Sequence, residues 1–170
     1  MRHALVVYES MFGNTHEVAT AIADGLRESF DVTVSEVSDA PPEVPSDVEF
    51  LVVGGPTHAL GMSRPRTRQS AGQQGADPLA ASHDGIREWV GRVSAPEGTM
   101  TATFDTKVVK PHLPGSAASS AQRKLRHRGL TAATPPETFY VTGTEGGLVE
   151  GELERAKAWG AELSQKVPAR

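Results

Sequence analysis

The sequence has 170 residues, of which 38% are hydrophobic and 22% charged, with no cysteine and a formal net charge of −4. This length suits one domain with a sizeable core, and no apolar run approaches the ~20 residues that span a bilayer. The lack of cysteine excludes disulfides, thiolate metal sites and iron–sulfur chemistry. No signal pattern precedes the first apolar run, so we expect a cytoplasmic protein without membrane insertion.

Five short runs rich in β-branched or aromatic residues predict buried strands. They are residues 4–8 (ALVVY), 32–37 (VTVSEV), 50–54 (FLVVG), 101–105 (TATFD) and 138–142 (TFYVT). The first and third are continuously apolar, which is typical of central strands covered on both faces. The second alternates between apolar and polar residues, which indicates an edge strand.

Segments of helical length separate these runs. The first helix is expected to begin near Asn14 or Thr15, and it carries Val18, Ile22 and Leu26 at four-residue spacing. Similar stripes recur at Ile86, Val90 and Val93, at Ala117, Ala121 and Leu125, and at Leu153, Ala156, Gly160, Leu163 and Val167. Strands that alternate with helices predict an α/β fold, with a parallel sheet covered by helices on both faces.

One polar segment interrupts this alternation. Residues 63–77 (SRPRTRQSAGQQGAD) contain no large aliphatic side chain and are dominated by Arg, Gln, Ser and Gly. This composition predicts a long exposed loop, inserted at about residues 63–78 of a single domain that spans residues 1–170.

Charge is distributed unevenly along the chain. Residues 1–62 carry 2 basic and 10 acidic side chains, whereas residues 63–130 carry 11 basic and 5 acidic ones. The basic side chains cluster at Arg64, Arg66 and Arg68 and again at Arg123, Lys124, Arg126 and Arg128. Each cluster is either an ordinary solvated surface or a field that favours an acidic partner or an anionic substrate. Neither has the interleaved aromatic residues of a nucleic-acid site, so we do not expect nucleic-acid binding.

The segment between the first strand and the first helix has the features of a phosphate site. Residues 9–15 read ESMFGNT, and the N–H groups at the start of a helix are free to bind an anion. Ser10, Asn14 and Thr15 add polar donors, while Gly13 lets the backbone turn closely. The segment lacks the lysine of a GxxxxGK[ST] loop, and GxGxxG is absent. An ordinary strand-to-helix turn remains the alternative interpretation.

Three segments together resemble the flavodoxin family. SMFGNT follows the first strand, GGPTHALG stands at the end of the third, and FDTKVVKPHLPGSAA follows the fourth, at the positions of that family's flavin-binding loops. The order of elements also matches over nearly the whole chain. The resemblance implies a flavodoxin-like three-layer sandwich, with a five-stranded parallel sheet in the order 2-1-3-4-5 and flavin at the switch point between strands one and three.

The resemblance also implies a cofactor, flavin mononucleotide (FMN), and the residues that hold it. The phosphate would be bound by Ser10, Met11, Phe12, Gly13, Asn14 and Thr15. One side of the flavin ring would be lined by Pro56, Thr57, His58, Ala59, Leu60 and Gly61, and the other side by Phe104, Asp105, Thr106 and Lys107. For His58, two roles stay open: an imidazole that donates to the flavin and titrates near neutral pH, or a loop side chain bonded to the backbone.

Two kinds of function follow from this resemblance. The first is electron transfer between a reductase and an acceptor, either a redox partner protein or a small molecule, by a monomer or dimer. The second is an NAD(P)H-dependent oxidoreductase of the quinone-reductase type, because SMFGNT is also close to the SMYGHT loop of those enzymes. The few aromatic residues in the loops leave a third alternative open, a flavin-free binding module.

Overall fold

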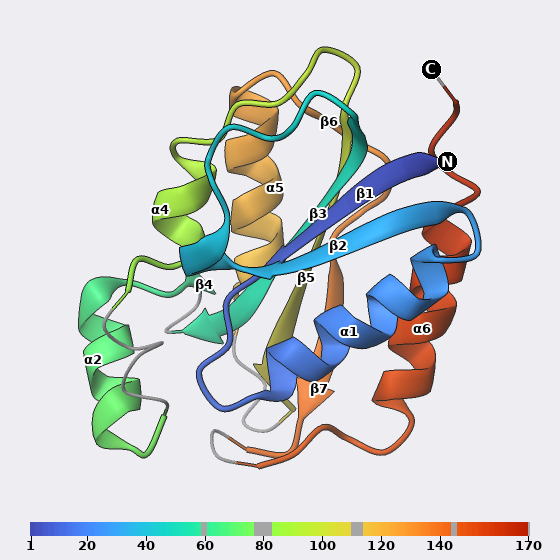
Figure 1. The fold of residues 1–170 in the computed structure, drawn as a ribbon. Coiled ribbons are helices and arrows are strands. Elements are labelled where there is room, and N and C mark those ends of the chain that lie inside the picture. Colours follow the sequence, from blue (N-terminus) through green and yellow to red (C-terminus); the bar gives the residue numbers. More distant parts are fainter. Residues whose placement is uncertain (59–60, 77–82, 110–113, 144–145, 170) are drawn as a thin grey trace.

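The computed structural model describes residues 1–58, 61–76, 83–109, 114–143 and 146–169, and it shows a twisted sheet between two layers of helices (Figure 1). The strands are β1 (Arg2–Tyr8), β2 (Phe30–Glu36), β3 (Val48–His58), β4 (Gly61–Met62), β5 (Met100–Val108), β6 (Thr131–Ala132) and β7 (Glu137–Val141). The helices are α1 (Asn14–Leu26), α2 (Pro65–Gln73), α4 (Ile86–Val90), α5 (Ala117–His127), α6 (Glu152–Leu163) and a short 3₁₀ helix η1 (Val37–Asp39).

The long strands are parallel and follow the predicted order. β1 pairs with β2 on one side and with β3 on the other, β3 pairs with β5, and β5 pairs with β7. Among the five strands that the sequence predicts, β5 is the fourth and β7 is the fifth, so the order is 2-1-3-4-5. The α/β class and the flavodoxin-like three-layer architecture are therefore confirmed.

Two short strands were not predicted. β4 pairs antiparallel with the end of β3, and β6 pairs parallel with the beginning of β5. β7 then pairs with the end of β5, so this edge of the sheet consists of two pieces. Pro135 and Pro136 lie between them and lack the N–H that a continuous ladder needs.

The register aligns the ends of the central strands. Tyr8, the last residue of β1, lies opposite Glu36 of β2 and Gly54 of β3. The carboxyl ends of the parallel strands therefore lie along one edge, and the segments that follow β1, β3 and β5 leave the sheet there (Figure 1). Ligands bind at this edge in open α/β sheets.

The face of the sheet that α1 and α6 cover holds one of the two main hydrophobic clusters. The two helices pack with their backbones in close contact: a Cβ added at Gly160 would lie 2.2 Å from the carbonyl oxygen of Ile22. The core face of α6 differs in part from the prediction, because Leu153 is exposed and Trp159 is buried in its place. Val167 is buried as expected, but it lies beyond the helix end.

The opposite face is covered by α4 and α5 and holds the second cluster. Trp89 and Leu125 are fully buried there, and the indole N–H of Trp89 donates to the carbonyl of Ala40 at 3.0 Å. α4 is shorter than its stripe predicts. It ends at Val90, and Val93 is buried in the turn that follows. No helix in the described parts of the chain is long and apolar enough to cross a bilayer.

The polar segment after β4 contains a helix, so the predicted loop over residues 63–77 is wrong in its central part. α2 begins with Pro65, whose fixed φ suits the first helical position. The side chain of Thr67 accepts the backbone N–H of Arg64 at 2.9 Å, which caps the helix start. Arg and Gln are good helix formers, and helical propensity does not require an apolar stripe.

α2 packs on the rest of the protein through few side chains. Ala71 is buried, and with Ala76 it contacts Met11 of the segment that follows β1. Arg68 is also buried, with only 2% of its surface exposed. The basic cluster at residues 64–68 is therefore not uniformly solvated, because its third member lies inside the protein.

Candidate functional site

The segment between β1 and α1 leads into the start of α1, where helix N–H groups are free. Gly13 precedes the first helical residue with a φ of 96°, a left-handed conformation that favours glycine. The first helical hydrogen bond runs from the N–H of Glu17 to the carbonyl of Gly13, so the N–H groups of residues 14–16 have no partner within the helix. The hydroxyl of Ser10 accepts the N–H of Gly13 at 3.1 Å and stabilises the turn.

Two side chains fasten this segment to its neighbours. The amide nitrogen of Asn14 donates to the carbonyl of Gly146 at 2.6 Å. The hydroxyls of Thr15 and Thr106 share a buried hydrogen bond of 2.7 Å, which connects α1 with β5. The start of α1 is therefore held to β5 and to the segment after β7 before any ligand binds, and the backbone N–H groups remain the available donors.

A small cavity of about 90 Å³ lies between these segments and the end of β3. Many of the predicted site residues line it: Met11, Phe12, Asn14, Thr15, Pro56, Thr57, His58 and Thr106. Val108 and Val141 complete the wall, and sequence reasoning missed both. Each is the last residue of its strand, β5 or β7, and this position is the signal that would have found them, since parallel strands end at one edge.

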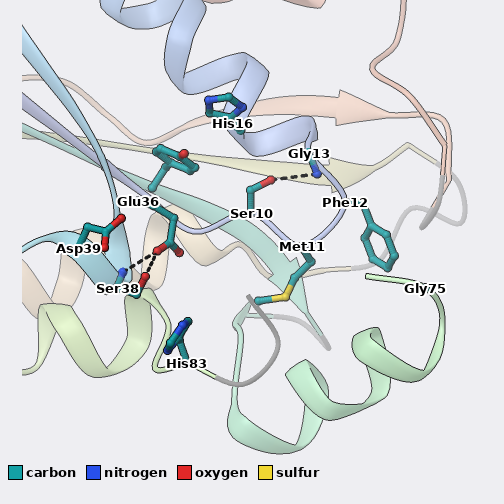
Figure 2. A pocket seen from close by; sticks show the side chains of 11 residues that line it. Ser10, Met11, Phe12, Gly13, His16, Glu36, Ser38, Asp39, Gly75 and His83 are labelled. Carbon is teal, nitrogen blue, oxygen red and sulfur yellow. Dashed lines mark hydrogen bonds between the residues drawn. The ribbon is translucent and has the colours of Figure 1, made fainter. Parts of the chain in front are cut away.

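The remaining predicted residues lie elsewhere. Ser10 and Gly13 line a neighbouring cavity on the other side of the same segment (Figure 2). Gly61 pairs with His58 in the β3–β4 hairpin, and the ammonium of Lys107 donates to the carbonyl of Gly115. Ala59 and Leu60 fall outside the described residues.

Phe104 is in the core, so the prediction that it lines the flavin ring is wrong. Its side chain is 1% exposed, and its ring centroid lies 6.5 Å from that of Trp159 of α6. A Cβ at Gly54 would lie 2.1 Å from the Phe104 ring, so the glycine makes room for it. Side chains alternate across a strand, and Phe104 faces the α1–α6 layer rather than the strand end.

Asp105 is also fully buried, and it positions α5 rather than facing a cavity. Its Oδ2 accepts the hydroxyl of Thr57 at 2.9 Å, the hydroxyl of Ser116 at 2.5 Å and the N–H of Ala118 at 3.1 Å. A carboxylate at the start of a helix satisfies free N–H groups and favours the helix dipole. The Oδ1 atom is buried without a partner among the described residues.

His58 is neutral in this structure. Its Nδ1 lies 3.1 Å from the hydroxyl of Thr67 in α2. Burial, and to a smaller extent the guanidinium of Arg68, lower the pKa of His58 from its ordinary 6.5 to about 4. A pKa this low does not fit the hypothesis that this imidazole titrates near neutral pH.

A buried polar network lies behind His58 and joins α2 to the sheet. Glu9 accepts the hydroxyl of Ser63 at 2.5 Å and the N–H of Ile86 at 2.8 Å. Arg68 donates to the same Ser63 hydroxyl at 2.7 Å and to the carboxylate of Glu88 at 2.5 Å. Burial raises the pKa of Glu9, whereas its hydrogen bonds and the nearby Arg68 act in the opposite direction. Sequence reasoning did not anticipate this network.

The second basic cluster is partly structural. Arg128 donates to the carbonyls of Val93 and Gly91, at 2.5 and 3.0 Å, and so connects the end of α5 to the turn after α4. Arg123 and Arg126 are exposed on α5. The interpretation as a solvated helix face fits these two residues.

The order of the sheet, the segment after β1 and the cavity at the strand ends define a flavodoxin-like α/β protein. The flavodoxin family model matches residues 6–71, which include the end of β1, the segment between β1 and α1, β3 and most of α2. No curated protein matches the sequence.

Solved structures extend the similarity to the whole fold. A flavodoxin from the domain Archaea is 23% identical, with a TM-score of 0.68 over 97% of this chain and 98% of its own. Flavodoxin 1 from Bacillus cereus is 19% identical, with a TM-score of 0.67 over 96% of this chain and 97% of its own. A Streptococcus pneumoniae flavodoxin is 19% identical, with a TM-score of 0.63 over 97% of this chain and 99% of its own. The family match covers residues 6–71, and the solved structures show that the whole chain has a flavodoxin-like fold.

Proposed function

We propose that this chain binds FMN and transfers electrons between a reductase and an acceptor. The observation that carries the proposal is the set of free N–H groups at the start of α1, next to a cavity formed by the ends of β3 and β5. This is the switch point of the sheet, where the chain leaves β1 toward one face and β3 toward the other.

The residues present fit a phosphate monoester. Backbone N–H groups at a helix start and the dipole of α1 favour a dianionic group. Gly13 has nothing within 4 Å of the place where a Cβ would stand, so the turn is open on its outer side. The segment contains no Lys or Arg, and hydroxyl and N–H donors therefore supply the binding.

The cavity beside the loop suits the edge of a planar, partly apolar ring. Met11, Pro56 and Val108 supply apolar contacts, and the neutral imidazole of His58 supplies a polar one. Flavin accepts and releases electrons when bound, and the protein supplies binding, orientation and the local field. The neutral His58 adds no positive charge at this wall, and the nearest buried cation, Arg68, is paired with Glu88.

A binding titration with a charge variant tests the proposal. Purified apoprotein is titrated with FMN, and binding is followed by quenching of flavin fluorescence. Ser10→Asp adds one negative charge beside the proposed phosphate, and Ser46→Asp adds the same charge at an exposed position far along the chain. At an effective dielectric constant near 20, such a charge costs roughly 1–4 kcal/mol of binding, which corresponds to about 5- to 1000-fold in affinity.

We expect saturable FMN binding that Ser10→Asp weakens and Ser46→Asp leaves unchanged. Failure of the wild-type protein to bind FMN would overturn the proposal. Equal affinity of both variants for FMN would place the phosphate somewhere other than the segment after β1.

A further inference from the structure

A second cavity lies on the β2 side of the anion-binding segment (Figure 2). Its volume is about 620 Å³, several times that of the cavity beside β3. Its polar wall is formed by Tyr8, Ser10, His16, Glu36, Asp39 and His83. FMN bound as proposed above would extend from the segment after β1 toward β3 and β5. Apart from the wall that it shares with the phosphate site, this cavity would therefore lie outside the FMN site.

The cavity contains two carboxylates at the end of β2. Glu36 is the last residue of β2 and lies opposite Tyr8, and Asp39 follows in η1. One carboxylate oxygen of Glu36 accepts the N–H of Ser38 at 2.8 Å as well as its hydroxyl, which fixes the side chain. Both carboxylates raise the pKa of the Tyr8 phenol, although burial of the phenol is the larger cause.

The lining selects against anions and for a hydroxyl-bearing aromatic group. None of the described residues that line the cavity is Lys or Arg, so its polar wall offers hydrogen-bond acceptors rather than a cation for a phosphate. Carboxylates accept hydrogen bonds from a ribose diol. The rings of Tyr8 and His16 lie with their centroids 5.1 Å apart and provide a surface on which a base can stack.

The two cavities share part of one wall. Met11 and Phe12 line both of them, whereas Ser10 and Gly13, from the same segment, line only the cavity on the β2 side. In Figure 2, Glu36, Ser38 and Asp39 lie on one side of the larger cavity, across from Met11 and Phe12. A ligand that follows the loop from the cavity beside β3 would therefore pass the phosphate site and enter the cavity beside β2.

From this geometry we propose that the β2-side cavity binds the adenosine half of FAD, whose phosphates lie on the segment after β1 and whose flavin lies at the ends of β3 and β5. In doubly wound dinucleotide folds an acidic residue beyond β2 hydrogen-bonds the ribose in the same position relative to the phosphate loop. The proposal rests on the proposed function, because it uses the same phosphate site and the same flavin cavity.

The proposed adenosine site is tested by measuring the affinities of the apoprotein for FAD and for FMN separately by calorimetry. We expect FAD to bind at least about tenfold more tightly than FMN, because the adenosine adds hydrogen bonds to charged groups. Glu36→Gln and Asp39→Asn should each lower the affinity for FAD about tenfold. Neither substitution should lower the affinity for FMN, because FMN does not reach the two carboxylates. Glu43→Gln, an exposed neighbour with the same loss of charge, is the matched control and should change neither affinity.

The outcomes separate the two proposals. FMN binding without tighter binding of FAD would overturn the adenosine site and leave the proposed function intact. The adenosine site would also be overturned if FAD bound more tightly than FMN but Glu36→Gln and Asp39→Asn left the affinity for FAD unchanged, because the added affinity would then come from another surface. Failure of both flavins to bind would overturn the proposed function and the adenosine site together. A fall in the ratio of FAD to FMN affinity in both variants, but not in Glu43→Gln, supports the adenosine site.

Discussion

Replacing Arg68 with methionine removes the one cation in the buried network between α2 and the sheet. Methionine keeps most of the length of the arginine side chain and loses its hydrogen bonds to Ser63 and Glu88. Glu9 then stays buried with Arg87 as its remaining nearby cation, and Glu88 loses its partner; breaking a buried ion pair typically costs about 3–5 kcal/mol. Ser63 and the N–H of Ile86 still donate to Glu9, so we expect the lower end of this range.

The matched control is Arg66→Met. Arg66 lies in the same helix and is exposed, and the same substitution there should change the free energy of unfolding by less than about 0.5 kcal/mol. Urea unfolding followed by circular dichroism measures both variants at pH 7. If both variants lost the same small amount of unfolding free energy, the reasoning would be refuted, because the network would then add nothing to stability.

The pH dependence of Arg68→Met gives a second test of the same idea. The Glu9 pKa is already raised by burial, and loss of the nearby guanidinium raises it further. A folded state with a raised carboxyl pKa binds more protons than the unfolded state, so its stability increases as the pH falls through that pKa. The decrease in unfolding free energy caused by Arg68→Met should therefore be smaller at pH 5 than at pH 8. A loss that is the same at both pH values would contradict this assignment.

Two further predictions concern packing and pH. Gly160→Ala should destabilise the protein by more than about 1 kcal/mol, because the new Cβ meets the Ile22 carbonyl oxygen at 2.2 Å; Gly147→Ala, which meets nothing within 4 Å, should be near neutral in the same urea experiment. His58 should titrate at about 4 by NMR, well below its ordinary 6.5. Between these two pH values the unfolded state binds a proton that the folded state does not bind. The contribution of His58 to stability is therefore present at pH 7 and lost as the pH falls toward 4. His58→Gln should reduce the slope of unfolding free energy against pH in this range. An imidazole that titrates near 6.5 would contradict the buried, neutral state.

The fold could be predicted because its signals are local. The continuous apolar runs of β1 and β3 and the spacing of Val18, Ile22 and Leu26 in α1 depend only on neighbours in the sequence. The start of α1 was also predictable, since a glycine and an asparagine stand directly after the polar turn. These patterns determine the order of elements, and the order determines where the strand ends meet.

The burial of polar residues could not be predicted in the same way. Glu9 looks like an ordinary loop carboxylate, and it is buried because partners 54 and 77 residues away donate to it. Arg68 belongs to a segment without large aliphatic side chains, so no periodicity indicates that one arginine of three points inward. Phe104 was assigned to the wrong face because the run TATFD does not show which side of the strand faces α6.

The most direct test of the central claim compares FMN with riboflavin, which lacks only the phosphate. If the free N–H groups at the start of α1 bind the phosphate, apoprotein should bind FMN at least about tenfold more tightly than riboflavin, as expected for hydrogen bonds to a charged group. Fluorescence titration of both ligands under one set of conditions gives the ratio. Equal affinities, or tighter binding of riboflavin, would contradict a phosphate site in the segment between β1 and α1.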